Sequence, residues 1–273
     1  MKPSQFDYIR ADSADEAVAL LAEHGEEARV LAGGQSLMAI LNMRLAEPKV
    51  LVDIHRAADL AGIEVRGVRL HVQAAVTQAA LERHADLARR LPMLAQALPN
   101  LGHFQTRNRG TVCGSIAHAD PSAELPLCLA TLGGQVVLRS RRGQRTVAAQ
   151  EFFTGMLQTA CAPDELVEEV RFPLSRTGER HGFIEVSMRH GDFAIVALAA
   201  VVDADAIRLG VGGVGDRPQV ARWPKLAGSA LDDALNQFGW DLGARDDVHA
   251  TAVYRRHLVR TLGRQLIERL GTT

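Results

Sequence analysis

Apolar positions in the first fifty-odd residues alternate between helical and strand-like spacing. Ser13 and Glu16 form a capping-box pair ahead of the apolar face of "AVALLAEHG", and Gly25 suits the end of that helix. Farther along, the pattern predicts a strand in "ARVLAG", a helix in "SLMAILNMRL" and a strand in "KVLVDI". The chain therefore begins as helix, strand, turn, helix and strand.

The middle of the chain mixes both periods. Residues 63–76 are strand-like, with a polar turn at Arg66 and Gly67, and Thr77 suits the cap of a following helix. The apolar spacing predicts three helices, in "QAALERHADLARR", "PMLAQALPNLG" and "AELPLCLATLGG", and two strands, in "QVVLRS" and "DELVEEVRFP".

Strands followed by helices characterise the last hundred residues. The polar segment 174–182 predicts a boundary, so we divide the chain into residues 1–173, subdivided near residue 55, and residues 174–273. Three strands are expected in "FIEVSMR", "AIVALAAVVD" and "IRLGVGGVG", then helices in "ALDDALNQF" and from His249 to Leu270. This order predicts an α+β fold.

Composition excludes several classes of protein. The 273 residues include 31 basic and 32 acidic side chains, which leaves a net charge of −1 and no electrostatic footprint for nucleic acid or an anionic membrane. No apolar run could span a bilayer, and the first residues do not resemble a signal peptide, so a cytoplasmic protein without membrane insertion is expected. The three cysteines form no CxxC pair, which disfavours a disulfide framework, a zinc knuckle or an iron–sulfur cluster held by this chain.

The segment "GVGGVG" at residues 210–215 fits the dinucleotide-binding pattern GxGxxG, with Asp232 and Asp233 near the acidic offset. That fingerprint requires a helix directly after the turn. Here "DRPQVARWP" follows, with two prolines and no helical period. We therefore interpret this segment as a glycine-rich strand and turn.

A different glycine stretch, "LAGGQSLMAILNMRLAEP", has the chemistry of an anion site. Gly33 and Gly34 allow positive φ and close approach of the backbone to a ligand, and consecutive N–H groups can cradle an anion. The N-terminus of the following helix and the Ser36 hydroxyl add to this, which suits a phosphate or pyrophosphate. The alternative is a plain tight turn.

A second stretch, "GTVCGSIAHADPSAELP", offers hydroxyls from Thr111 and Ser115 and a close backbone approach at Gly114. Asp120 would repel a phosphate, but it can accept a hydrogen bond from a ribose or ribityl hydroxyl; the alternative is a turn or capping role. His118 with Asp120 lacks further ligands, so no metal site is expected.

No self-contained catalytic centre is evident. The sequence has no GxSxG, no supported Cys–His arrangement and no carboxylates paired in an apolar setting. We therefore predict no catalytic residue, and a bound cofactor would have to carry the chemistry.

The two stretches "AGGQSLMAILNMRLAEP" and "RNRGTVCGSIAHADPSAELP" together resemble the FAD-binding medium subunit of the xanthine dehydrogenase family of molybdenum hydroxylases, which includes carbon monoxide dehydrogenase. The resemblance extends to "DFAIVALAAVV" and "LGVGGVGDRP", and so covers essentially the whole chain. It implies a two-subdomain FAD-binding fold over residues 1–173, similar to vanillyl-alcohol-oxidase-type flavoproteins, and a smaller C-terminal α+β domain over residues 174–273.

The resemblance also implies which residues hold FAD, without a covalent bond. The first stretch would wrap the pyrophosphate, the second would close on it from the other side, and Asp120 would meet a sugar-like hydroxyl. Arg189 and Phe193 would lie near the flavin ring, although Phe193 could instead pack in the core. The implied cofactor-binding residues are Ala32, Gly33, Gly34, Gln35, Ser36, Leu37, Thr111, Gly114, Ser115, Asp120, Arg189 and Phe193.

One feature departs from the family pattern. The second motif more often reads T-x-G-G-N in the family. In this chain Cys113 replaces the first glycine and Ser115 replaces the asparagine, so part of the first glycine's backbone freedom is lost. Arg107 and Arg109 could face a phosphate or a partner subunit, or be an exposed solvated pair.

The implied activity is electron transfer within a complex. Electrons from a large molybdopterin subunit would pass through two [2Fe–2S] clusters in a small subunit to FAD in this chain, and then to an external acceptor such as NAD⁺ or oxygen. The cysteines here cannot hold those clusters, so both partner subunits are required. A stand-alone flavin oxidase and a non-redox nucleotide-binding module are the alternatives.

Overall fold

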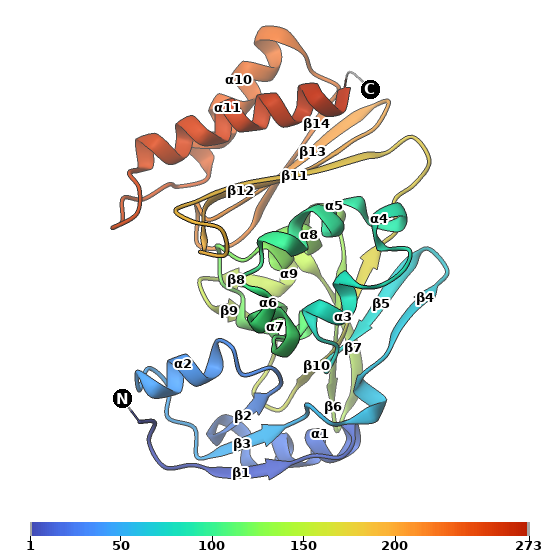
Figure 1. Cartoon of the computed structure of the whole chain (residues 1–273), viewed down its shortest axis with the longest axis vertical. Helices are drawn as coiled ribbons and strands as arrows, with labels where there is room; N and C mark the ends of the chain where they lie inside the picture. Colours follow the sequence, from blue (N-terminus) through green and yellow to red (C-terminus); the bar gives the residue numbers. More distant parts are fainter. Residues whose placement is uncertain (1, 272–273) are drawn as a thin grey trace.

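A computed structural model describes residues 2–271. Its first layer is a parallel sheet in the order β1-β3-β2, flanked by α1 and α2 (Figure 1). Ser13 caps α1 by accepting a hydrogen bond from the Glu16 N–H at 3.2 Å, and Gly25 ends the helix with φ of 52°, as expected. The elements are β1 (Asp7–Arg10), α1 (Ala14–His24), β2 (Ala28–Leu31), α2 (Leu37–Asn42) and β3 (Val50–Asp53).

The second layer is an antiparallel five-stranded sheet in the order β4-β5-β10-β6-β7. A set of short helices lies between it and the C-terminal sheet (Figure 1). The strands are β4 (Ile63–Arg66), β5 (Arg69–Gln73), β6 (Gln135–Ser140), β7 (Gly143–Ala148) and β10 (Leu166–Pro173), with a small hairpin of β8 (Phe153–Gly155) and β9 (Gln158–Thr159). The helices are α3 (Gln78–Glu82), α4 (Leu87–Arg90), α5 (Pro92–Ala97), α6 (Phe104–Arg109), α7 (Val112–His118), α8 (Glu124–Leu132) and α9 (Ala149–Phe152).

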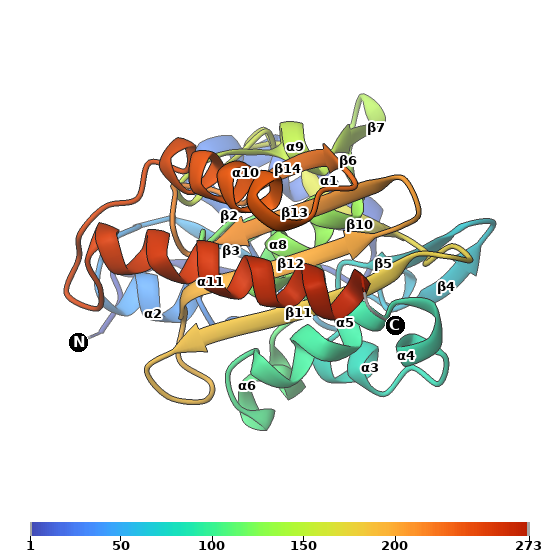
Figure 2. The same ribbon diagram turned by 90° about the horizontal axis from the view of Figure 1, so that it is seen from above.

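The third layer is an antiparallel sheet in the order β11-β12-β13-β14, covered by α10 and α11 (Figure 2). Every residue of β12 is buried because helices pack on both faces of the sheet. Ala197 and Ala199 belong to the core shared with α8, whereas Val196 and Leu198 belong to the core beneath α11. The elements are β11 (Arg180–Ser187), β12 (Ala194–Val202), β13 (Ala206–Gly212), β14 (Gln219–Pro224), α10 (Gly228–Asp241) and α11 (Ala252–Gly271).

The "GVGGVG" segment forms the end of β13 and the turn that leads to β14, which confirms its interpretation as strand and turn. Gly210 and Gly212 face α8. A β-carbon at Gly210 would lie 1.9 Å from Thr131 Oγ1, and one at Gly212 would lie 3.2 Å from the Pro121 carbonyl oxygen. These glycines therefore let the helix approach the sheet.

Two expectations about helices were wrong in detail, and two further helices were not expected. The region 78–90 is two short helices, α3 and α4, rather than one. The α-helix that begins at Pro92 ends at Ala97, and a 3₁₀ turn follows it, because Pro99 has no N–H to donate to the helix. The second glycine stretch, to which no element was assigned, contains helix α7, and helix α6 lies before it.

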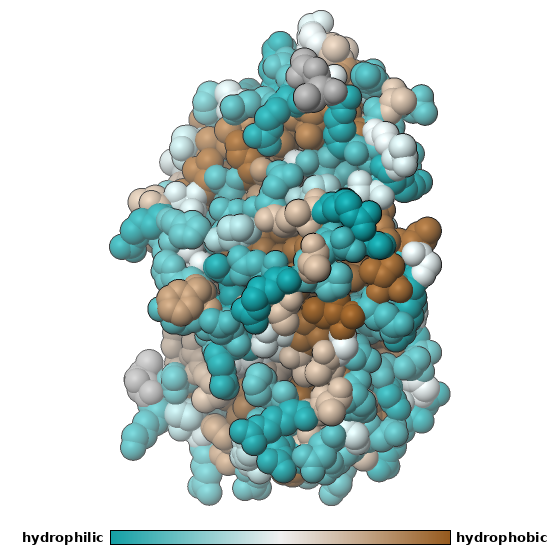
Figure 3. All heavy atoms as spheres, turned by 45° about the vertical axis from the view of Figure 1, so that its right-hand side comes forward, coloured by the Kyte–Doolittle hydropathy of each residue, from teal (hydrophilic) through white to brown (hydrophobic). Residues whose placement is uncertain are grey.

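Hydrophilic side chains cover most of the face drawn in Figure 3, with apolar side chains gathered in patches between them. Among residues 2–271, no helix is both long and apolar enough to cross a membrane.

Candidate functional site

A cleft of about 1530 Å³ lies where the first sheet, the central helices and the third sheet meet. Both glycine stretches reach it, together with the loop between β11 and β12. The structure thus places all the predicted cofactor-binding residues in one cavity: Ala32, Gly33, Gly34, Gln35, Ser36, Leu37, Thr111, Gly114, Ser115, Asp120, Arg189 and Phe193.

Residues 33–36 form the turn between β2 and α2. Gly34 has φ of 71°, a backbone conformation that favours glycine. Within residues 2–271, the backbone N–H groups of residues 33–36 donate to no protein acceptor. A row of free donors ahead of a helix has the chemistry of an anion cradle, so this turn fits the diphosphate of FAD.

Gly33 has a different role from the one expected. A β-carbon there would lie 2.3 Å from the Arg109 carbonyl oxygen and 2.6 Å from Gly110 Cα. Its missing side chain therefore brings the two glycine stretches into backbone contact. Positive φ, expected for both glycines of the first turn, occurs at Gly34 and not at Gly33.

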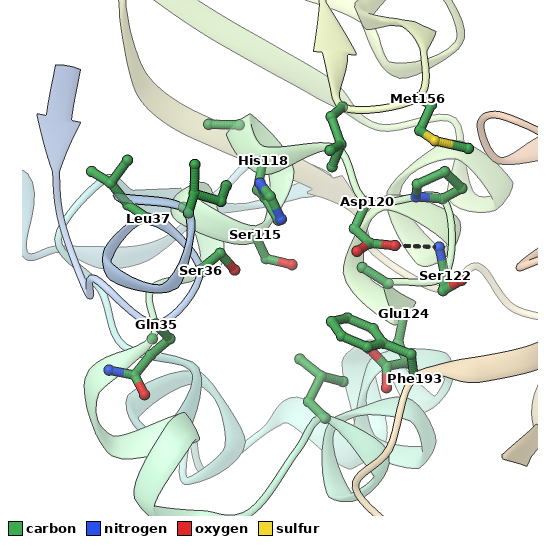
Figure 4. Close-up of a pocket in the computed structure, with 18 of the residues that line it drawn as sticks. Gln35, Ser36, Leu37, Ser115, His118, Asp120, Ser122, Glu124, Met156 and Phe193 are labelled. Carbon is green, nitrogen blue, oxygen red and sulfur yellow. Dashed lines mark hydrogen bonds between the residues drawn. The ribbon is translucent and has the colours of Figure 1, made fainter. Parts of the chain in front are cut away.

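The second stretch is largely satisfied by its own hydrogen bonds. Thr111 caps α7, and its Oγ1 accepts a hydrogen bond from the Gly114 N–H at 3.0 Å. The Val112 N–H donates to the Val76 carbonyl oxygen at 3.0 Å. Ser115 and His118 extend from the same helix toward the opening (Figure 4). The α7 backbone thus offers fewer free donors than the first stretch, and the Ser115 hydroxyl is its exposed contribution.

Cys113 lies at the cleft, but its thiol is buried in the protein. It is 2% exposed, and its thiol donates to the Val72 carbonyl oxygen at 3.4 Å. Burial raises the pKa of the thiol well above its usual value. Because position 113 is helical, glycine's extra freedom is not needed there, and cysteine fills the core beneath the cleft.

Asp120 lies at the end of α7, after Ala119 in the left-handed region with φ of 53°. Its Oδ1 accepts a hydrogen bond from the Ser122 N–H at 2.8 Å (Figure 4). The turn-forming alternative is therefore confirmed. Asp120 also lines the cleft, so it can contact a ligand from this turn.

The arginines near the site divide into two kinds. Arg107 is 13% exposed and is held by Glu82 at 2.9 Å and by the Leu101 carbonyl oxygen at 3.1 Å, so the exposed, solvated alternative was wrong for it. Arg189 is 85% exposed and pairs with Asp192 at 3.3 Å. Phe193 is 68% exposed, which excludes the core-packing alternative.

Sequence reasoning missed two polar features of the cleft wall. Gln78 is buried, and its Oε1 has no hydrogen-bond partner among the described residues. Glu124 and Glu185 are close enough for their side chains to share a hydrogen bond, and burial and their mutual repulsion raise the pKa of Glu124. The expectation of no paired carboxylates was therefore wrong, because the two glutamates lie on separate elements, α8 and β11.

No group of three or more His, Cys, Asp or Glu side chains in the described part of the chain could hold a metal ion. His118 stands apart from such partners, and burial lowers the pKa of its imidazole.

Comparisons with known proteins agree with this geometry. Residues 4–175 match the family described as "FAD binding domain in molybdopterin dehydrogenase". The chain is 35% identical over 275 residues to the 6-hydroxypseudooxynicotine dehydrogenase complex subunit alpha of Paenarthrobacter nicotinovorans, with 96% of this chain and 93% of the relative covered. It is 33% identical to the carbon monoxide dehydrogenase medium chain of Afipia carboxidovorans, with 98% of each covered.

Solved structures show the same fold. A chain of the reconstituted CO dehydrogenase from Oligotropha carboxidovorans matches with a TM-score of 0.94 at 33% identity, covering 99% of both chains. One of quinoline 2-oxidoreductase from Pseudomonas putida 86 matches with a TM-score of 0.92 at 32% identity, covering 99% of this chain and 98% of that one. This chain belongs to the family of FAD-binding domains of molybdopterin dehydrogenases.

Proposed function

We propose that this chain is the FAD-binding medium subunit of a heteromeric molybdenum hydroxylase. It accepts electrons from [2Fe–2S] clusters of a small partner subunit, which draws them from a large molybdopterin subunit, and passes them to an external acceptor. The observation that carries the proposal is the row of free N–H donors at residues 33–36 inside a cleft that both glycine stretches line.

The residues of the cleft divide the cofactor between them. The backbone of residues 33–36 binds the diphosphate, the Ser115 hydroxyl donates beside it, and the Asp120 carboxylate accepts a hydrogen bond from a sugar-like hydroxyl. FAD supplies the redox chemistry when it is bound. Arg189 and Phe193, both exposed at the rim of the cleft, meet the ring system.

We further propose a two-subdomain flavoprotein architecture similar to vanillyl-alcohol-oxidase-type proteins, with divisions near residues 55 and 173. The end of β10 at Pro173 and the start of β11 at Arg180 support the second division. A cytoplasmic location is part of the same proposal.

The direct test is the cofactor content of the purified chain. We expect a yellow protein with about one FAD per chain, released as free FAD by heat or acid because no residue attaches it covalently. FMN as the extracted species would contradict the diphosphate cradle, and flavin retained on the denatured chain would contradict non-covalent binding.

A further inference from the structure

A buried carboxyl group of the cleft wall, that of Glu124, lies close to the half-buried carboxyl group of Glu185 behind it. Glu124 lies in the first turn of α8, is 8% exposed and lines the cavity. Glu185 lies on β11 opposite Ala197, which belongs to the core on the α8 side of the sheet. Its Oε2 is buried and has no hydrogen-bond partner within residues 2–271. No lysine, arginine or histidine of the described chain is among the groups that act on either glutamate.

Among the described residues, no cationic side chain is one of the groups that act on the pair. The groups that act on Glu124, besides Glu185, include Asp120, and the thiol of Cys128 lies close enough to feel both glutamates. Helix α5, which packs on β11 and α8, and strand β12 have no titratable side chains.

Charged groups on the other neighbouring elements are engaged elsewhere. His118 of α7 interacts with Asp120, and Arg208 of β13 pairs with Glu179 at 3.1 Å. Helix α11 covers the opposite face of the sheet, as Figure 2 shows. Within residues 2–271, neither carboxyl group is therefore neutralised by a cationic side chain.

Two adjacent carboxylates in a poorly solvated site cannot both ionise at low cost, because desolvation and repulsion both favour keeping a proton. Burial and the charge of Glu185 raise the pKa of Glu124 to about 8, and burial raises the pKa of Glu185 to about 7. At neutral pH, the pair retains a proton that exposed glutamates would have lost.

The position of Glu124 relates this proton to the cofactor. In Figure 4, Glu124 and Phe193 lie together across the opening from Gln35 and Ser36. A doubly ionised pair would repel the negative diphosphate of FAD, whereas a protonated carboxyl group can donate a hydrogen bond to the carbonyl oxygens of a flavin ring.

We propose that Glu124 and Glu185 hold one proton between them at neutral pH, and that the Glu124 O–H turns from Glu185 to donate to FAD when the cofactor enters the cleft. Glu185 is a positioning residue, because it acts on the cofactor through Glu124. The second part of the inference rests on the proposed function, whereas the shared proton itself does not.

The first experiment examines the FAD-free full chain by infrared spectroscopy. We expect a protonated-carboxyl band in the wild type at pH 7 that disappears at higher pH and is weaker in the Glu124→Gln variant. In Glu185→Gln the band should disappear at a lower pH, because the charge of Glu185 no longer repels that of ionised Glu124 and the pKa of Glu124 falls. The control is Glu23→Gln, at an exposed position on α1, which should match the wild type. A wild type without the band at pH 7 would overturn the shared proton.

The second experiment measures FAD affinity of the same proteins between pH 6 and 9. The wild type and Glu23→Gln should lose affinity about tenfold for each pH unit above the titration of the pair. Glu124→Gln should show no such loss, since an amide donates a hydrogen bond without ionising. Parallel pH profiles of the wild type and Glu124→Gln would overturn the role toward FAD. A chain that shows the titrating band but binds no FAD at any pH would refute both the proposed function and the role of Glu124 toward FAD. It would still support a proton shared by the two glutamates.

Discussion

Two glycine-rich segments of this chain look alike in sequence and do opposite things in the structure. The turn at residues 33–36 leaves its backbone N–H groups unpaired in the cleft, within the described part of the chain. The segment at 210–215 is largely strand and turn: Gly210 pairs with Val220, and the Gly213 N–H donates to the Pro121 carbonyl oxygen at 2.8 Å. One segment offers its backbone to a ligand, and the other lets a helix pack on a sheet.

The difference shows what a glycine motif leaves undecided. Spacing reports where side chains are missing, whereas function depends on where the backbone donors point and whether they are already paired. The element that follows each glycine motif distinguishes a ligand-binding turn from a packing turn. Helix α2 follows residues 33–36, whereas strand β14 follows residues 210–215. Substitutions in the two segments should therefore separate cofactor binding from folding.

The largest expected effect is on stability, from Gly210→Val. The new β-carbon would stand 1.9 Å from Thr131 Oγ1 and 2.9 Å from Leu127 Cδ1, both in the tightly packed α8 interface. We expect the free energy of unfolding to fall by about 3 kcal/mol, measured by urea denaturation, while FAD per folded molecule stays constant. Adding Thr131→Ala should recover part of the loss. Loss of FAD from molecules that remain folded would contradict the claim that residues 210–215 serve packing and not cofactor binding.

The converse effect is expected from Gly34→Val. Valine at φ of 71° would strain the turn and displace the free N–H donors. We expect FAD affinity to fall about thirtyfold, equivalent to about 2 kcal/mol, by fluorescence titration. The matched control is Gly67→Val, where φ is 58° and no neighbour lies within 4 Å of the added β-carbon. Equal loss of FAD affinity in both variants would mean that Gly34 merely shapes a turn.

Glu124, across the cleft from residues 35 and 36 (Figure 4), should make the stability of the chain depend on pH. The raised pKa of Glu124 means that the folded chain binds a proton which the unfolded chain has lost. Stability from this group is therefore complete below about pH 4.5 and is lost as the pH rises toward about 8. In urea denaturation of the FAD-free chain, the wild type should lose up to about 1.4 kcal/mol per pH unit relative to Glu124→Gln. Identical slopes would show that the carboxyl group is ionised in the fold.

The smallest effect is expected in the second glycine stretch. Thr111→Val removes the hydroxyl that accepts from the Gly114 N–H and keeps the shape of the side chain. The loss of this helix cap should cost about 1 kcal/mol of stability in thermal or urea denaturation, with less than a threefold change in FAD affinity. A much larger loss of affinity would indicate that the Thr111 hydroxyl itself binds the cofactor.

Local patterns predicted the parts of the fold that depend on nearby residues. The Ser13 capping box, the apolar run of β12 and the turn at residues 33–36 all appeared where expected. Helix α7 was missed because its seven residues include Gly114 and Ser115, which are poor helix formers, and because its stability comes from the Thr111 cap and packing on the central sheet.

Contacts between distant segments could not be predicted in the same way. The packing of Gly33 on Arg109 and the meeting of Glu124 with Glu185 depend on how separate elements are placed in space. Arg107 also looked available for a ligand in the sequence, because its partner Glu82 belongs to another helix. For the candidate site, the sequence thus predicted the residues of the cleft better than their individual roles.

The central claim is that flavin in this chain receives electrons from a partner subunit. Its most direct test is reduction of the FAD-loaded chain, followed by the bleaching of its visible absorbance under anaerobic conditions. We expect dithionite to bleach the isolated chain and aldehydes or N-heterocycles to leave it oxidised, whereas addition of the small and large partner subunits should let the substrate of the complex bleach it. Rapid, stoichiometric bleaching of the solitary chain by one of these organic substrates would contradict the account and identify a stand-alone flavin oxidase.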